Sequence, residues 1–81
     1  MWFVYILLCA DNSLYTGASN DPEGRFEQHK SGKGSKYTRS HKPLKIIYQE
    51  QLPTKSEALK REIEIKSWSR NKKIANLRLP L

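Results

Sequence analysis

The sequence predicts a small α/β domain of the α+β kind, in which a three-stranded sheet is flanked by helices. Two apolar segments near the start, separated by the turn cluster Asp11-Asn12-Ser13, are typical of a β-hairpin, and capping signals further on are typical of helices. The chain has 81 residues, of which 37% are hydrophobic, so it can bury one modest core and has no room for a second domain. We therefore expect residues 1–81 to form a single domain.

The first two strands are expected at residues 2–9 and 14–18, where aromatic, β-branched and other apolar residues predominate. Successive side chains of a strand point to opposite faces, so the hairpin loop decides whether Tyr5 and Tyr15 share a face. An even-numbered tight loop separates them, whereas an odd-numbered loop or a bulge brings them together. If the two phenols belong to one site, the odd arrangement is expected.

The first helix is predicted over residues 22–31. Asp21, or the residue before it, can cap its N-terminus, and proline suits the first helical position because an N–H there has no partner within the helix. Arg25 and His29 are four residues apart, so they lie on one face of this helix. Each of them alone is typical of a solvated helix surface.

The stretch Gly32–Arg39 is basic, contains two glycines and is expected to be a loop. A loop whose cations follow a phosphate backbone, with one aromatic ring that stacks on a base, accounts for this composition. The alternative is a solvated basic face without a partner. The candidate nucleic-acid-binding residues of this region are Lys33, Lys36, Tyr37, Arg39 and Lys42.

A third strand is expected at residues 44–52, where apolar and polar residues alternate and a proline follows. Thr54 and Glu57 have the spacing of a capping box and predict a helix over residues 54–68. A serine then offers a cap for a short last helix over residues 69–77. The sheet is therefore expected to be mixed or antiparallel, with helices covering it.

Glu62 lies close to the centre of an apolar stripe on the helix predicted over residues 54–68. At about 100° per residue the members of this stripe are Ala58, Leu59, Ile63, Ile65 and Trp68. A carboxylate in that position is costly unless it is paired or used in chemistry. An internal ion pair with Arg25 or Lys66 and a functional role are both open.

The charge balance favours an anionic partner. Lys and Arg total 15 against 8 acidic residues, which gives a formal net charge of +7 and points to nucleic acid or an acidic membrane surface. Cys9 is the single cysteine, so no internal disulfide and no multi-cysteine zinc site can form, which fits a reducing cytoplasm. The apolar run Trp2–Ala10 is too short to span a bilayer and is interpreted as a core strand.

Two short motifs carry a resemblance to a known family. Phe3-Val4-Tyr5 and Tyr15-Thr16-Gly17, followed by an arginine and a histidine four residues apart, resemble the GIY-YIG nuclease domain, and in particular its small single-domain bacterial members. The resemblance runs from about Trp2 to Lys73. Phe3 replaces the glycine of the first motif and Thr16 replaces the isoleucine of the second, while both tyrosines and the final glycine are kept.

The resemblance implies a site in which Tyr5, Tyr15, Arg25, His29 and Glu62 converge around one metal ion. By this resemblance Tyr5 is the base or a proton relay, and Tyr15 orients water or phosphate. Arg25 stabilises the charge that builds on phosphorus, His29 contacts phosphate or assists proton transfer, and Glu62 holds Mg²⁺ or Mn²⁺. One carboxylate suits Mg²⁺, which keeps most of its waters, and suits zinc poorly. Asn71 is a further, weaker candidate.

The expected function is that of a metal-dependent DNA endonuclease in DNA repair or nucleic-acid processing in the cytoplasm. No membrane partner is expected, and the protein is expected to be a monomer or a weak dimer. RNA is not excluded as a substrate. Target choice would come from DNA structure, a partner protein or weak sequence preference. The alternatives are a non-catalytic nucleic-acid-binding module that keeps the fold, and a protein-interaction domain whose charge is incidental.

Overall fold

The structure, a computed structural model that describes residues 1–34 and 36–81, is built on a three-stranded antiparallel sheet. Its strands are β1 (Trp2–Cys9), β2 (Leu14–Ser19) and β3 (Pro43–Leu52), in the order β2-β1-β3. The central strand β1 therefore pairs on both sides, which fits its nearly continuous apolar sequence. The predicted three-stranded sheet is confirmed, and it is purely antiparallel.

The β1–β2 hairpin has the odd-numbered loop that places both motif tyrosines on one face. The Cys9 N–H donates to the Ser13 carbonyl at 2.9 Å, which leaves three residues in the loop, and Asn12 has φ 70°. Asparagine tolerates this left-handed conformation better than most residues. The resulting register pairs Leu7 with Tyr15 and Tyr5 with Gly17, so Tyr5 and Tyr15 point the same way.

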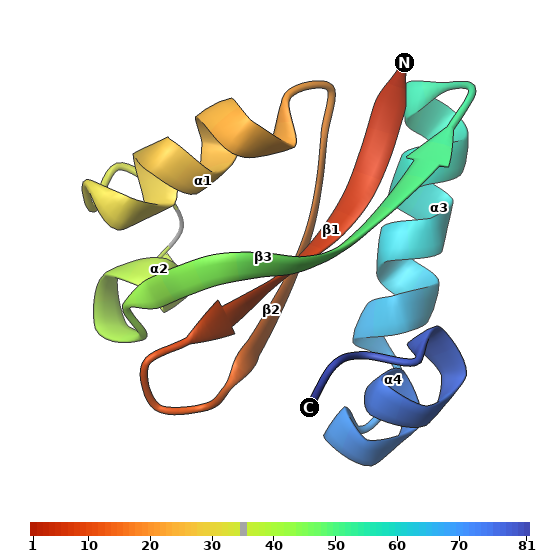
Figure 1. The fold of residues 1–81 in the computed structure, drawn as a ribbon. Helices are drawn as coiled ribbons and strands as arrows, with labels where there is room; N and C mark the ends of the chain where they lie inside the picture. The colour runs from red at the N-terminus through yellow and green to blue at the C-terminus, as the bar shows by residue number, and fades with distance from the viewer. Residues whose placement is uncertain (35) are drawn as a thin grey trace.

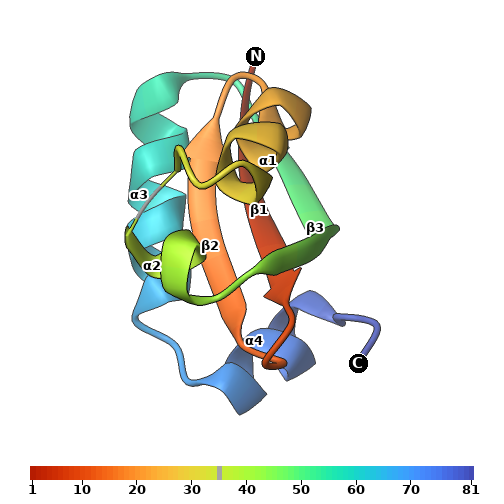
Figure 2. The same cartoon turned by 90° about the vertical axis from the view of Figure 1, so that its left-hand side faces the viewer.

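Helices cover both faces of the sheet (Figures 1 and 2). On one face lie α1 and the short α2, and on the other lies α3, with α4 beyond its C-terminal end (Figure 1). Three of the helices begin at predicted caps, because the side chains of Asp21, Thr54 and Ser69 accept hydrogen bonds from N–H groups of the first turns. The helices are α1 (Pro22–Lys30), α2 (Lys36–Ser40), α3 (Lys55–Lys66) and α4 (Arg70–Leu77).

Two expectations about the helices were wrong. The stretch Gly32–Arg39 is not a loop throughout, since α2 begins at Lys36; Ser35 lies outside the described residues. The apolar stripe on α3 is also narrower than expected, because Leu59 and Ile63 are 40% and 68% exposed. Its buried residues are Ala58 and Ile65, so Glu62 lies at the margin of the buried face and not at its centre.

The hydrophobic core lies between the sheet and α3. Val4 and Ile6 of β1 are fully buried and pack with Ala58 and Ile65 of α3, and Leu79 after α4 closes the cluster. Because side chains alternate along a strand, the intervening residues of β1 point to the opposite face, under α1 and α2. The same strand therefore supplies the core on one face and a second set of buried side chains on the other.

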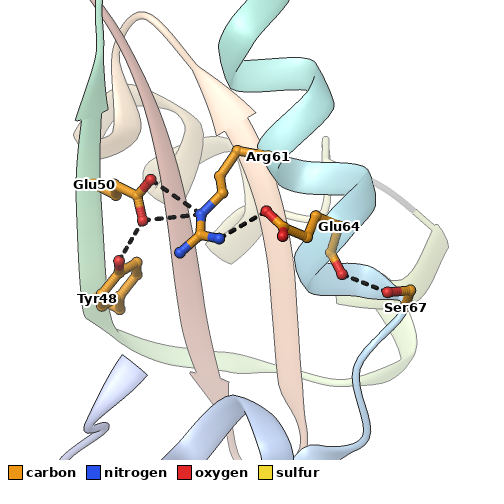
Figure 3. A network of polar contacts seen from close by, with 5 residues as sticks. All are labelled: Tyr48, Glu50, Arg61, Glu64 and Ser67. Atoms are coloured by element: carbon orange, nitrogen blue, oxygen red, sulfur yellow. Dashed lines mark hydrogen bonds and ion pairs between the residues drawn. The ribbon is translucent and has the colours of Figure 1, made fainter. Parts of the chain in front are cut away.

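A polar network fastens α3 to the edge strand β3 (Figure 3). Arg61 donates through Nε to the Glu50 carboxylate, with a shortest distance of 3.0 Å, and through a terminal nitrogen to Glu64 at 2.7 Å. The Tyr48 hydroxyl donates to Glu50 at 2.5 Å. This network fixes the position of α3, the helix that carries Glu62.

Within the described residues, no helix is both long and apolar enough to cross a membrane.

Candidate active site

Tyr5 is a buried polar side chain on the α1 face of the sheet. Its side chain is 1% exposed, and its hydroxyl oxygen lies 3.2 Å from Nε2 of His29 on α1. The ring lies over Gly17 of the paired strand, where an added Cβ would come within 2.6 Å of the hydroxyl oxygen. A glycine is therefore needed at position 17, because any side chain there would occupy the volume of the Tyr5 phenol.

His29 is enclosed between Tyr5 and α2. It is 1% exposed, and its Nδ1 lies 2.8 Å from the hydroxyl oxygen of Thr38, which is itself 3% exposed. The Tyr15 ring packs edge-on against the imidazole, with centroids 5.0 Å apart. Gly34 closes the Nδ1 side, because a Cβ there would collide with the imidazole. His29 is therefore held between two hydroxyl groups, that of Tyr5 at Nε2 and that of Thr38 at Nδ1.

The electrostatic surroundings keep both groups neutral near pH 7. The pKa of Tyr5 is raised to about 12, chiefly by burial and next by the Tyr15 phenol. Arg25 opposes this rise: its hydrogen bond to the phenol and its charge both lower the pKa of Tyr5, whereas the Glu62 carboxylate raises it. Burial lowers the pKa of His29, and the Arg25 charge lowers it further.

Four aromatic rings continue from the site toward α2. After His29 and Tyr15 comes Tyr37, whose centroid lies 5.6 Å from that of Tyr15, and then His41, stacked on Tyr37 at 4.1 Å and 10°. His41 also places Nε2 3.5 Å from the Asp11 carboxylate in the β1–β2 loop. One face of the Tyr37 ring is thus already covered by a side chain of this protein.

Arg25 and Glu62 lie on different helices, and the charges of both act on the pKa of Tyr5. Arg25, on α1, is exposed and donates to the Gln28 side chain at 2.9 Å. Glu62, on α3, has a side chain that is 16% exposed and forms an ion pair with Lys66 at 3.1 Å. Of the two ion pairs expected from the sequence, the structure contains the one with Lys66.

The residues present fit a hard divalent cation held by few protein ligands. Among residues 1–34 and 36–81 no three His, Cys, Asp or Glu side chains come together as a metal-binding cluster. Glu62 is a mostly buried carboxylate whose charge acts on Tyr5, and Mg²⁺ is commonly bound by one or two carboxylates plus waters. Lys66 is about half exposed, so it can release the carboxylate to an incoming ion.

The other predicted residues lie at the surface. Asn71 is exposed in the first turn of α4. The sequence analysis did not identify Thr38, because nothing in the pattern around a threonine in a basic stretch indicates a contact with a distant histidine. The four predicted DNA-binding cations are all exposed, in α2 and the segments on either side of it: Lys33, Lys36, Arg39 and Lys42.

The chain belongs to the GIY-YIG family, a family of nuclease domains. Residues 1–75 match the family model of the GIY-YIG catalytic domain. This match covers both tyrosine motifs, α1 with its arginine and histidine, and the whole of α3. The family predicted from the two motifs is thus confirmed.

Within this family the chain is similar to small proteins called UPF0213. It is 54% identical over 72 residues to UPF0213 proteins of Staphylococcus aureus strains Mu3 and N315, which covers 89% of this chain and 88% of each relative. The solution NMR structure of a UPF0213 protein from Bacillus halodurans has a TM-score of 0.61 at 43% identity, covering 96% of this chain and 84% of that one. A protein from E. faecalis has a TM-score of 0.64 at 39% identity, covering 94% and 81%.

Proposed function

We propose that this protein is a divalent-metal-dependent endonuclease that hydrolyses phosphodiester bonds in DNA, acting in the cytoplasm in repair or nucleic-acid processing. The observation that carries the proposal is the buried pair formed by Tyr5 and His29, with Arg25 beside the phenol. A core has no need of a buried phenol hydrogen-bonded to a buried imidazole near an arginine, whereas phosphodiester hydrolysis needs a proton acceptor and a cation.

Tyr5 and His29 together supply the proton acceptor. A phenol with a pKa of about 12 keeps its proton near pH 7, so Tyr5 alone is a poor base. His29 is neutral there and its Nε2 lies 3.2 Å from the phenol oxygen. As Tyr5 takes a proton from the attacking water, its own proton passes to His29 Nε2, so the phenol is unchanged at the end of the step.

The remaining site residues act on charge and orientation. Arg25 neutralises the charge that builds on the phosphate, for which its planar, permanently charged guanidinium is suited. Tyr15, packed against His29, presents its hydroxyl for orienting water or phosphate. Glu62 holds Mg²⁺ or Mn²⁺, and the bound ion lowers the cost of activating water and of releasing the leaving oxygen.

The exposed cations around α2 give the DNA a binding surface. Helix α2 lies on the same side of the sheet as α1, which carries Arg25 (Figure 2), so a strand held there can reach the site. Cations of this kind bind the phosphate backbone and carry no sequence information. Tyr37 adds one free ring face at most, since His41 covers the other. The surface therefore favours recognition of the backbone and of DNA shape.

The test is a cleavage assay with a panel of labelled substrates. Single-stranded, duplex, flap and junction DNA, with matched RNA strands, would be incubated with the purified protein and Mg²⁺, Mn²⁺ or chelator. We expect metal-dependent cleavage of at least one DNA substrate and none by Tyr5→Phe purified in the same way. Tight binding without cleavage under every condition would overturn the enzyme assignment.

The second candidate is a nucleic-acid-binding module without catalysis, and one observation favours it. The Glu62–Lys66 ion pair at 3.1 Å satisfies the carboxylate without a metal. The two candidates differ in the effect of metal ions: Mn²⁺ should bind the enzyme at Glu62 but should not bind a module in which Lys66 is the permanent partner. Neutralising Lys66 as Lys66→Met should then strengthen Mn²⁺ binding in the enzyme.

A further inference from the structure

Thr38 forms the far end of a buried chain of three polar side chains. Tyr5, His29 and Thr38 are 1%, 1% and 3% exposed, and the two links measure 3.2 Å at Nε2 and 2.8 Å at Nδ1. The three groups come from β1, α1 and α2, so the fold itself brings them together. We infer that Thr38 is a positioning residue that holds His29 in the tautomer protonated on Nδ1 and thereby leaves Nε2 free to accept the Tyr5 proton.

The direction of these hydrogen bonds follows from what surrounds Tyr5. The phenol is buried, and His29 Nε2 lies 3.2 Å from its oxygen. A buried hydroxyl proton needs an acceptor, so the phenol donates its proton to Nε2. A neutral imidazole that accepts at Nε2 carries its proton on Nδ1, and this proton is donated to the Thr38 hydroxyl oxygen.

Burial makes the tautomer depend on the Thr38 hydroxyl. The backbone of Gly34 closes against the Nδ1 edge so tightly that a Cβ does not fit, which leaves little room for a water to replace the hydroxyl. Without an acceptor, a proton on Nδ1 would be buried and unpaired. The imidazole then gains by moving its proton to Nε2, where it donates to the Tyr5 oxygen and blocks proton acceptance.

The experiment reads the tautomer directly, by long-range ¹H–¹⁵N spectra of the full-length protein labelled with ¹⁵N-histidine. The chain has 2 histidines, and His41→Gln assigns them. At pH about 8, above the ordinary histidine pKa of roughly 6.5, we expect His29 to show the pattern of an imidazole protonated on Nδ1.

Substitutions at Thr38 separate tautomer control from packing. Thr38→Val keeps the shape and removes the hydroxyl, so His29 should change to the Nε2-protonated form; Thr38→Ser should restore the original pattern. The matched control is Thr16→Val on the other face of the sheet. Thr16 is also 3% exposed, and its hydroxyl has no hydrogen-bond partner among the described residues. Thr16→Val should leave the His29 spectrum unchanged.

The inference gives the site a third member and rests on the proposed function only for its catalytic consequence. If the protein cleaves DNA, kcat should fall by about 10²-fold in Thr38→Val, with little change in KM, and recover in Thr38→Ser. The tautomer can be read even if no cleavage is found, so the failure of the nuclease proposal is a separate outcome. An Nε2-protonated His29 in the unmodified protein, or an unchanged pattern in a folded Thr38→Val, would overturn the inference.

Discussion

At the scale of single residues, β1 serves two purposes through the alternation of its side chains. Val4 and Ile6 build the core against α3, while Tyr5 between them points to the opposite face and meets His29. A one-residue change of register would exchange the two sets, placing the phenol in the core against α3 and two aliphatic side chains under α1, where the phenol meets His29. The three-residue hairpin loop that sets this register is therefore as important to the site as the tyrosines.

Glu62→Gln tests the proposed metal ligand. The substitution keeps the shape and hydrogen-bonding capacity of the side chain but removes the charge that attracts the ion. Cleavage should be lost while DNA binding survives, and Mn²⁺ binding followed by electron paramagnetic resonance should weaken strongly. Glu64→Gln, on the same helix but within the Arg61 network, is the control and should bind Mn²⁺ normally. Full activity in Glu62→Gln would remove this residue from the mechanism.

Arg25→Lys tests the role of the guanidinium fork. Lysine keeps the positive charge but cannot engage two oxygens in one plane. We expect kcat to fall by about 10²-fold or more, the loss typical of a missing transition-state contact, while the affinity for DNA changes far less. Steady-state kinetics with equilibrium binding would show this split. Near-normal turnover would mean that Arg25 is only a general phosphate anchor.

Gly17→Ala tests the steric explanation of the second motif. The new Cβ would lie 2.6 Å from the Tyr5 hydroxyl oxygen, in a site where the ring has little room to move. Overpacking of this kind should lower the free energy of unfolding by about 1–3 kcal/mol and displace the phenol from His29. Urea denaturation with a cleavage assay measures both effects. Ala18→Gly in the same strand is the control for backbone flexibility, and it should reduce stability without moving Tyr5.

Residues whose type and spacing suggest chemistry could be predicted from the sequence. Residues whose role depends only on their contacts in the fold could not. The convergence of Tyr5 and His29 was expected from the resemblance to the GIY-YIG domain, while the hairpin loop placed Tyr5 and Tyr15 on one face. Thr38 could not be predicted, since its role depends on how α2 folds back onto α1. The sequence identifies Gly34 as a candidate turn residue, but only the folded structure shows that its backbone packs against the His29 imidazole.

At the scale of elements, caps and turns were predicted well and the extent of burial was not. Asp21, Thr54 and Ser69 cap their helices because each can accept from an N–H of the first turn within a few residues, which is a local property. The exposure of Leu59 and Ile63 depends instead on how far α3 lies over the sheet. Helix α2 has five residues, too few for a periodic pattern to be recognised.

Arg61→Met tests whether the network between α3 and β3 holds the two elements together (Figure 3). Methionine fills a similar volume but leaves the Glu50 carboxylate, which is 25% exposed, without its cation. The partial exposure limits the cost, so we expect a loss of about 1–2 kcal/mol in the free energy of unfolding. Urea denaturation should show it, whereas Glu64→Gln, which removes a more exposed partner, should cost less than about 1 kcal/mol. Equal effects of the two variants would contradict a special role for the Glu50 pair.

At the scale of the whole molecule, the net charge of +7 is divided between two surfaces. One basic set surrounds α2, next to α1, and another lies along α3 and α4 on the opposite side of the sheet (Figure 1). Charge at a distance attracts DNA from either surface, but only cations in contact with phosphates release counterions. The salt dependence of binding can therefore locate the DNA on one side of the sheet.

Two triple variants with the same change of charge make this comparison. One neutralises Lys33, Lys36 and Arg39 as glutamines, and the other does the same to Lys55, Lys60 and Lys72; each removes three of the seven net positive charges. If the α2 surface contacts DNA, the first variant should flatten the plot of log K against log salt by about 0.7–0.9 for each lost phosphate contact. The second should shift affinity modestly and keep the slope.

The same pair of variants also separates binding from catalysis, because neither changes Tyr5, His29 or Glu62. Saturating DNA should restore most of the cleavage rate in the α2 variant, since the lost cations only hold the backbone near the site. Fluorescence anisotropy over a series of salt concentrations, for several unrelated sequences, gives the slopes. A flattened slope in the α3–α4 variant alone would place the DNA against α3 and α4 and would contradict the assignment of the α2 surface.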